Sequence, residues 1–258
     1  MKESPILFEI KDGIAYIILN RPNSHNAINL GMRQALCSAW NEIETNRDVL
    51  SVIVTGGDKV FSTGQDLQEL TEFRKKDQLS ELPLNSPETF GAKVKKPVIA
   101  AISGYCLGAG FLFTMVGSDV RIAAENAKFG MPEIKVGVPP TFGIPAILSS
   151  HFPPAVAAEL LLWGKNITAA DAYRLGYVNE VVKVEDLMSK AEEFARHINQ
   201  MSPYLTRSSK EVLRKVSEPD AKNIAYAQAM CLLGRHSEDY IEGPRAFREK
   251  RKPVWKNL

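Results

Sequence analysis

The chain has 258 residues, a formal net charge of +2 and a hydrophobic content of 45%. This length can bury a sizeable core in one α/β domain, with or without a helical appendage, and the nearly balanced charge argues against nucleic acid as a partner. Because we find no signal peptide and no long apolar span, we expect a cytoplasmic protein with no membrane association.

Cysteine and histidine usage gives no sign of a metal site. The three cysteines show no CxxC spacing, and the four histidines are scattered along the chain. Cys37, Cys106 and Cys231 lie among apolar or small residues, which predicts buried free thiols rather than disulfides or metal ligands.

The N-terminal segment predicts a hairpin, a helix and a buried strand. Two β-rich runs, 6–10 and 14–19, flank Asp12 and Gly13, a strong signal for a two-residue turn. Asn29 is placed to cap a helix that packs on the sheet, and a β-branched run at 52–55 predicts the strand. The apolar positions of this helix recur at helical spacing: Met32, Leu36, Trp40 and Ile43.

The middle of the chain contains a compact loop and a charged segment. Residues 61–67 form the loop, and residues 73–96 are charged, contain two prolines and lack sustained periodicity. Such a segment is typical either of a mobile cover over a site or of a solvent-exposed insertion.

A strand-to-helix turn follows. Residues 98–102 predict a short buried strand that turns through Gly104 and enters an apolar helix at the Gly/Ala cluster 108–110. Backbone N–H groups at a helix N-terminus suit a developing negative charge, although such a turn can equally serve close packing.

The remaining elements indicate a parallel sheet followed by helices. A strand at 120–123 continues the strand and helix alternation that is typical of βαβ units. The later half reads as helical apart from a short strand at 178–182, and its apolar faces indicate oligomerisation as readily as packing within the chain. The predicted helices span 155–163, 169–175, 185–200, 203–216 and 220–236, with Thr168 and Asp171 resembling a capping box.

Short motifs follow one another in a particular order along the chain. They are Asn20–Pro22 with Asn26–Ala27, Phe61–Leu67, Lys96–Ala101 with Gly104–Tyr105 and Gly108–Gly110, Asp119, Phe129–Glu133, Leu161–Gly176 and Ala246–Lys252. Together they resemble the crotonase superfamily of enoyl-CoA hydratases and isomerases. The resemblance covers almost the whole chain.

This resemblance implies a fold, an assembly and a class of substrate. The fold would be α/β, a crotonase (ClpP-like) spiral of ββα units over residues 1–200, with a C-terminal helical trimerisation region over residues 201–258. The assembly would be a homotrimer or homohexamer. The partner would be an acyl-CoA substrate, with no cofactor beyond the coenzyme A that belongs to it.

The resemblance also implies an oxyanion hole made by the backbone N–H groups of Thr63 and Ala109. Removing a proton next to a thioester, or adding a nucleophile to its conjugated alkene, places negative charge on the thioester oxygen. Each preorganised donor at that oxygen contributes roughly 3 to 4 kcal/mol. Because the main chain is the donor, Ala109 can stand where the family usually has glycine.

Further matched positions imply contacts with coenzyme A. Its adenine and pantetheine arm would pass along Thr63, Gly64, Gln65 and Asp66. Phe247 and Lys250 match positions from which a neighbouring subunit contacts coenzyme A, with the basic cluster 250–252 near the 3′-phosphate. The alternative is a charged helix end that faces solvent.

Two carboxylates distinguish a hydratase in this family, and only one has a match here. Glu133 matches one of them, whereas the other falls at Leu112, which cannot transfer a proton. In the nearby loop, Thr141 and Ile144 stand where glycine is usual. We expect an acyl pocket lined by Leu112, Thr141 and Phe142, with little room for a catalytic water.

One carboxylate is enough for a Δ3 to Δ2 enoyl-CoA isomerisation, because a single base can move the proton without water. We therefore expect an isomerase with Glu133 as the acid and base. A hydratase of a specialised dienoyl or cyclic acyl-CoA is the alternative, and a non-catalytic acyl-CoA-binding scaffold is an alternative of another class. For Asp66 and Asp119, helix capping or loop ordering is the expected role.

Overall fold

The computed structural model describes residues 4–75, 87–140 and 143–255. The chain forms two compact units, each made of several segments. Unit 1 comprises Met1–Gln65, Asn85–Phe129 and Ile167–Ser217, and unit 2 comprises Asp66–Leu84, Gly130–Asn166 and Glu218–Leu258. The expected division at residue 200, into a spiral and a trimerisation region, stays a prediction.

Unit 1 is built on a six-stranded sheet with the order β1-β2-β3-β5-β7-β10. The first two strands form an antiparallel hairpin, and the other neighbours pair in parallel. Asp12 and Gly13 have φ angles of 53° and 77°, as the predicted two-residue turn requires. The hairpin and the parallel sheet are therefore confirmed. The strands are β1 (Ile6–Lys11), β2 (Ile14–Leu19), β3 (Ser51–Thr55), β5 (Val98–Ile102), β7 (Val120–Ala124) and β10 (Glu180–Val182).

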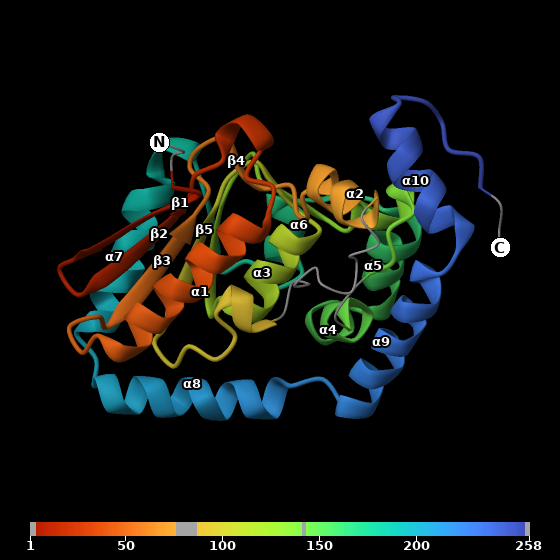
Figure 1. Ribbon diagram of the computed structural model, residues 1–258. Helices are drawn as coiled ribbons and strands as arrows, with labels where there is room; N and C mark the ends of the chain where they lie inside the picture. Colours follow the sequence, from red (N-terminus) through yellow and green to blue (C-terminus); the bar gives the residue numbers. More distant parts are fainter. Residues whose placement is uncertain (1–3, 76–86, 141–142, 256–258) are drawn as a thin grey trace. The chain divides into compact units, whose positions relative to one another are not determined.

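Two helices, α1 (Leu30–Thr45) and α7 (Leu187–Asn199), lie along opposite sides of this sheet in Figure 1. The Asn29 side chain accepts a hydrogen bond of 2.9 Å from the Met32 N–H, which confirms the predicted cap of α1. The buried face of α7 packs against isoleucines of the central strands. Both faces of the sheet are covered, as continuous apolar strands require.

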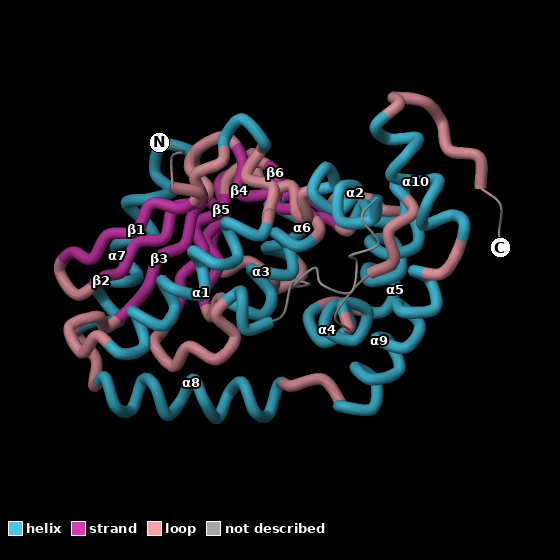
Figure 2. Tube along the Cα trace, in the orientation of Figure 1, coloured by secondary structure: helices cyan, strands magenta, loops and turns pink. Residues whose placement is uncertain are grey.

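A second, four-stranded sheet has the order β4-β6-β8-β9. It consists of β4 (Val60–Ser62), β6 (Tyr105–Leu107), β8 (Lys128–Gly130) and β9 (Ile167–Thr168). Two of these short strands lead into helices, β6 into α3 (Ala109–Gly117) and β9 into α6 (Ala169–Arg174) (Figure 2). The predicted capping box of Thr168 and Asp171 is present at the start of α6. The sequence predicted a loop at 61–67 and did not predict any of the four strands of this sheet.

The segment before β5 belongs to the core of unit 1. Phe90, at the end of the single turn η2 (Pro87–Phe90), is fully buried and stacks on Phe113 with the ring centroids 4.9 Å apart. Val94 and Lys96 are also buried. The prediction of a mobile cover or exposed insertion is therefore wrong for residues 87–96, and residues 76–86 lie outside the described residues.

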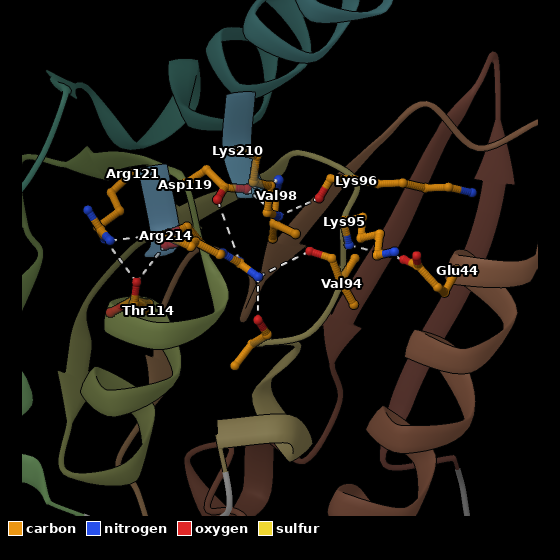
Figure 3. Close-up of polar contacts among 12 residues, drawn as sticks. Glu44, Val94, Lys95, Lys96, Val98, Thr114, Asp119, Arg121, Lys210 and Arg214 are labelled. Carbon is orange, nitrogen blue, oxygen red and sulfur yellow. Dashed lines mark hydrogen bonds and ion pairs between the residues drawn. The ribbon is translucent and has the colours of Figure 1, made fainter. Parts of the chain in front are cut away.

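Helix α8 (Pro203–Ser217), the last element of unit 1, is held to the rest of that unit by charged side chains (Figure 3). Lys210 Nζ lies 2.6 Å from Asp119 Oδ2, and this carboxylate oxygen also accepts from the Val98 N–H at 2.8 Å. Arg214 donates to the Val94 carbonyl at 3.1 Å. Asp119 thus orders the chain before β5, the role that the sequence predicted for it.

Unit 2 is mainly helical. Three of its helices were not predicted: α2, α4, and α10, whose Gly243 and Pro244 argue against a helix. The α-helices of unit 2 are α2 (Leu67–Lys75), α4 (Ile144–His151), α5 (Pro154–Ala158), α9 (Ala221–Arg235) and α10 (Glu238–Arg248). Tighter or wider turns occur at η3 (Pro132–Val136) and η4 (Glu159–Trp163), and in unit 1 at η1 (Pro22–Ser24) and η5 (Val184–Asp186).

The cysteine prediction is correct for one residue and wrong for another. Cys106 is buried, whereas Cys37 is exposed on α1. The side chain of Cys231 lies outside the described residues. Over the described ranges, none of the helices has both the length and the apolarity needed to cross a membrane.

Candidate active site

Two glycines bring the turn after β4 against the start of α3. A Cβ atom at Gly64, whose φ is +93°, would lie 2.9 Å from the Leu107 carbonyl oxygen and 3.0 Å from the Ala109 nitrogen. A Cβ atom at Gly110 would lie 2.7 Å from the Ser62 Cβ. Backbone therefore packs on backbone at this point, and a side chain at either glycine would push the two segments apart.

The start of α3 offers backbone donors. Gly108 precedes the helix with no side chain capping this end, and within the described residues the Ala109 N–H donates no hydrogen bond. The partial positive charge at a helix N-terminus favours a negatively charged group beside such donors. The predicted position of Ala109 next to the 63–65 turn follows from the contact with Gly64.

The predicted donor at Thr63 conflicts with the hydrogen bonds of this turn. The Thr63 N–H donates to the His25 carbonyl at 3.1 Å, and the Gly64 N–H donates to Ser62 Oγ at 3.1 Å. The turn itself is held by Ser62, whose hydroxyl donates to the Asn26 carbonyl at 2.8 Å. The Thr63 N–H is therefore used to fasten the turn, and sequence comparison could not reveal this bond.

The next two residues have partners of their own. Gln65 Oε1 accepts a 2.6 Å hydrogen bond from the buried Arg33 guanidinium, in unit 1. Asp66 Oδ1 accepts from the N–H groups of Gln68 and Glu69 at 3.1 and 3.2 Å, in unit 2. The predicted capping role of Asp66 is confirmed, whereas the predicted coenzyme A contacts of both residues stay predictions.

Glu133 is the candidate acid and base in unit 2, on the single turn η3 directly after Pro132. Its Oε2 atom is buried and has no hydrogen-bond partner among the described residues. Burial raises the pKa of this carboxyl to about 7, because the charged form loses hydration that a hydrogen bond to its own backbone replaces only in part. A carboxyl group with a pKa near neutrality can both take and return a proton.

The other predicted pocket residues are only partly described. Leu112 is fully buried on α3, the helix that begins at Ala109, so no carboxylate is placed at that point. Thr141 and Phe142 lie outside the described residues, and their predicted role in the acyl pocket stays a prediction.

The basic cluster 250–252, which the sequence resemblance places near coenzyme A, also makes contacts within the chain. The Phe247 side chain is 61% exposed at the end of α10, and Lys250 follows with a φ of 53°. Arg251, from the same basic cluster, forms ion pairs with Glu242 and Glu249. Sequence reasoning missed Glu242, because a single glutamate inside a helix gives no signal of burial.

A protein site for a metal ion usually needs at least three His, Cys, Asp or Glu side chains close together. Within the part of the chain that the structure describes, no three His, Cys, Asp or Glu side chains come together in such a group.

Comparison with known proteins identifies the family. Residues 9–258 match the family model described as enoyl-CoA hydratase/isomerase. A probable enoyl-CoA hydratase of Mycobacterium bovis is 36% identical over 256 residues, which cover 98% of each chain. A carnitinyl-CoA dehydratase of Salmonella enteritidis is also 36% identical, over 94% of this chain and 95% of the relative.

Solved structures agree with this result. A carnitinyl-CoA hydratase from Mycobacterium avium covers the whole of both chains with a TM-score of 0.87 and 32% identity. The crotonase fold and the resemblance inferred from the sequence motifs are both confirmed. The chain is therefore an enzyme of the enoyl-CoA hydratase/isomerase family.

Proposed function

We propose that the protein shifts the double bond of an acyl-CoA from Δ3 to Δ2, with Glu133 as its single acid and base. The observation that carries this proposal is the Glu133 carboxyl, with a buried Oε2 atom that no described residue binds and a pKa raised to about 7. The fully buried Leu112 supports it, because an apolar side chain cannot act as a second proton carrier.

The reaction divides into two proton transfers. Glu133 removes a proton from the carbon next to the thioester carbonyl, and the electron pair moves into a dienolate whose charge lies on the thioester oxygen. The protonated Glu133 then returns the proton at the γ carbon, which leaves the double bond conjugated with the carbonyl. No water is consumed, and no cofactor is needed beyond the coenzyme A of the substrate.

Backbone donors would stabilise the dienolate oxygen. We assign one donor to the Ala109 N–H, at the helix start, where roughly 3 to 4 kcal/mol of stabilisation is expected. We assign the second to the turn that contains Thr63 and Gln65, because this turn packs against the start of α3. Gln65 directly follows Gly64, the residue that contacts Ala109.

Hydration or dehydration of a specialised acyl-CoA is the second candidate function. The names of the relatives favour it, since they include an enoyl-CoA hydratase and a carnitinyl-CoA dehydratase. A single glutamate would then have to activate water and deliver the alkene proton in turn. This requirement is the reason for our preference for isomerisation.

A paired assay tests the two candidates. We expect the purified protein to convert 3-hexenoyl-CoA to the conjugated thioester, seen as a rise in ultraviolet absorbance, and to hydrate crotonyl-CoA slowly or not at all. Glu133→Gln should abolish the first activity. The matched control is Glu159→Gln, which removes a carboxylate from an exposed ion pair with Lys165 in the same unit.

Each other outcome has a definite meaning. Rapid hydration of crotonyl-CoA would refute the isomerase and require a second proton carrier. Binding of acyl-CoA without turnover of either substrate would favour the non-catalytic scaffold. Equal loss in Glu133→Gln and Glu159→Gln would remove Glu133 from the mechanism.

A further inference from the structure

Glu242 is a buried carboxylate in the middle of α10 that holds the segment after this helix. Only 5% of the residue is exposed, and its oxygens accept from Arg245 Nη2 at 2.6 Å, Arg251 Nη1 at 2.5 Å and the Val254 N–H at 2.8 Å. The bond from Arg251 and the Val254 N–H hold the pKa of this carboxyl well below its usual range. Residues 251–255, which we call the tail segment, are thus fastened to α10 by one side chain.

The tail segment and α10 both touch the turn after η3. A Cβ atom at Gly137 would lie 2.9 Å from Trp255 Cζ3 and 2.4 Å from the Asp239 carbonyl oxygen. A Cβ atom at Gly243 would lie 2.1 Å from the Val136 carbonyl oxygen and 2.7 Å from the Gly137 nitrogen. These distances leave no room for side chains, so helix backbone, turn backbone and the Trp255 ring are in direct contact.

The same turn fixes the backbone of Glu133. Gly137 has a φ of 62°, a left-handed conformation that favours glycine, and it ends η3. The next residue, Val138, donates its N–H to the Glu133 carbonyl at 3.0 Å. A continuous set of contacts therefore runs from the Glu242 carboxylate through the tail segment and Gly137 to Glu133, all within unit 2.

We propose that Glu242 is a positioning residue for Glu133, acting through the tail segment that it fastens against the turn after η3. This role rests on the proposed function of Glu133 as acid and base. Glu242 touches no reacting atom. Its task is to keep the Glu133 carboxyl in one place and shielded from water during the two proton transfers.

Two variants separate this role from a general loss of stability. Glu242→Gln keeps the shape of the side chain but removes the charge that binds Arg251. Glu249→Gln is the matched control, because it removes another carboxylate, 2.6 Å from the same arginine, without touching the Val254 N–H. Both are assayed on 3-hexenoyl-CoA across a pH series.

We expect kcat of Glu242→Gln to fall by about 10- to 100-fold, because small misplacements of a reacting group are costly, while KM stays within about twofold. The acid limb of its kcat profile should move to lower pH, because water that reaches Glu133 restores the usual acidity of the carboxyl. Glu249→Gln should match the wild type within about twofold. Equal behaviour of the two variants, or an unmoved acid limb in Glu242→Gln, would overturn the proposal.

A second measurement does not depend on turnover. Hydrogen exchange followed by mass spectrometry should show faster exchange over residues 131–138 in Glu242→Gln and in Trp255→Leu, with residues 98–117 unchanged. Unchanged exchange over residues 131–138 would refute the positioning of Glu133 through the tail segment and Gly137. It would leave the proposed function of Glu133 intact. A wild-type enzyme whose turnover does not depend on Glu133 would instead refute the proposed function, and the positioning role with it.

Discussion

The proposed role of Glu133 as a base requires a negative charge that its buried environment disfavours. As a base it must be ionised, and burial raises its pKa to about 7. We expect kcat/KM for the isomerisation to rise with pH through a single ionisation near 7 and then to level off. A pH series from 5 to 9 with 3-hexenoyl-CoA checks this, and an acid limb near 4.5 would contradict a buried catalytic carboxyl.

The raised pKa of Glu133 also affects the free energy of unfolding. Between pH 4.5 and 7 the folded chain keeps a proton on Glu133 that the unfolded chain has released, so the free energy of unfolding falls as pH rises through this window. We expect inactive Glu133→Gln to be about 1 to 3 kcal/mol more stable than the wild type at pH 8, and nearly equal to it at pH 4. Urea unfolding at the two pH values measures this difference. If the two proteins differed in stability by the same amount at pH 4 and at pH 8, the raised pKa of Glu133 would be contradicted.

Gly64 is the residue whose substitution should disturb the 63–65 turn and, with it, the proposed backbone donors. Gly64→Ala and the control Gly57→Ala share the cost of a positive φ, about 1 kcal/mol each. A Cβ atom at Gly57 meets nothing within 4 Å, whereas one at Gly64 presses on Leu107 and Ala109. We expect kcat to fall about 100-fold in Gly64→Ala and to stay within about threefold in Gly57→Ala. Similar kcat values for the two variants would show that this contact does not serve the reaction.

At the scale of single elements, Asp119 decides how α8 is held. Lys210 is 6% exposed, and burial lowers its pKa to about 8 despite the favourable Asp119 charge. Asp119→Asn leaves this ammonium without its carboxylate, and we expect it to reduce the free energy of unfolding by roughly 2 to 4 kcal/mol. Glu159→Gln, which breaks an exposed ion pair, should cost about 1 kcal/mol or less in the same urea titration. If Asp119→Asn and Glu159→Gln reduced the free energy of unfolding equally, the Asp119 contacts would stabilise the fold no more than an exposed ion pair does.

Local signals in the sequence were sufficient for most elements of unit 1. The Asp12–Gly13 turn and the Asn29 cap depend on neighbouring residues, and both were predicted correctly. Helix α10 was missed because contact with η3, not local propensity, permits Gly243 and Pro244 in it. Residues 87–96 were misread because their charges conceal the apolar anchors Phe90 and Val94.

The candidate site was predictable to a similar degree. Ala109 and Glu133 were assigned roles from short motifs, and these roles stay predictions, to which the structure adds a helix start at Ala109 and a buried oxygen on Glu133. Thr63 was assigned to a donor role that its bond to His25 opposes, and Glu242 was not noticed. Both depend on partners that are distant in the sequence, and motif spacing carries no information about such partners.

At the scale of the whole molecule, α8 points to an assembly with other copies. Its side toward the chain carries Lys210 and Arg214, whereas Leu205, Leu213 and Val216 are 62%, 64% and 74% exposed. A helix with its apolar side outward is expected to bury that side against a partner. We propose a second copy of this chain, in keeping with the trimer or hexamer implied by the sequence resemblance.

Light scattering coupled to size-exclusion chromatography tests this assembly. We expect the wild type to elute as a trimer or hexamer and Leu213→Glu to shift toward the monomer. Ser217→Glu adds the same charge at an exposed position of α8 without removing an apolar side chain, and it should elute as the wild type does. A monomeric wild type, or an unshifted Leu213→Glu, would argue against this interface.

The contact between Gly64 and Ala109 also bears on how such an enzyme can change during evolution. The donor proposed at Ala109 belongs to the main chain, so a mutation there can alter the shape of the site without deleting its N–H group, unless it introduces proline. A lineage can therefore gain or lose carboxylates, as the apolar Leu112 illustrates, and keep the means to stabilise a thioester enolate. The glycines that bring the two segments together leave no such freedom, because a Cβ atom at Gly64 or Gly110 would press on the opposite segment.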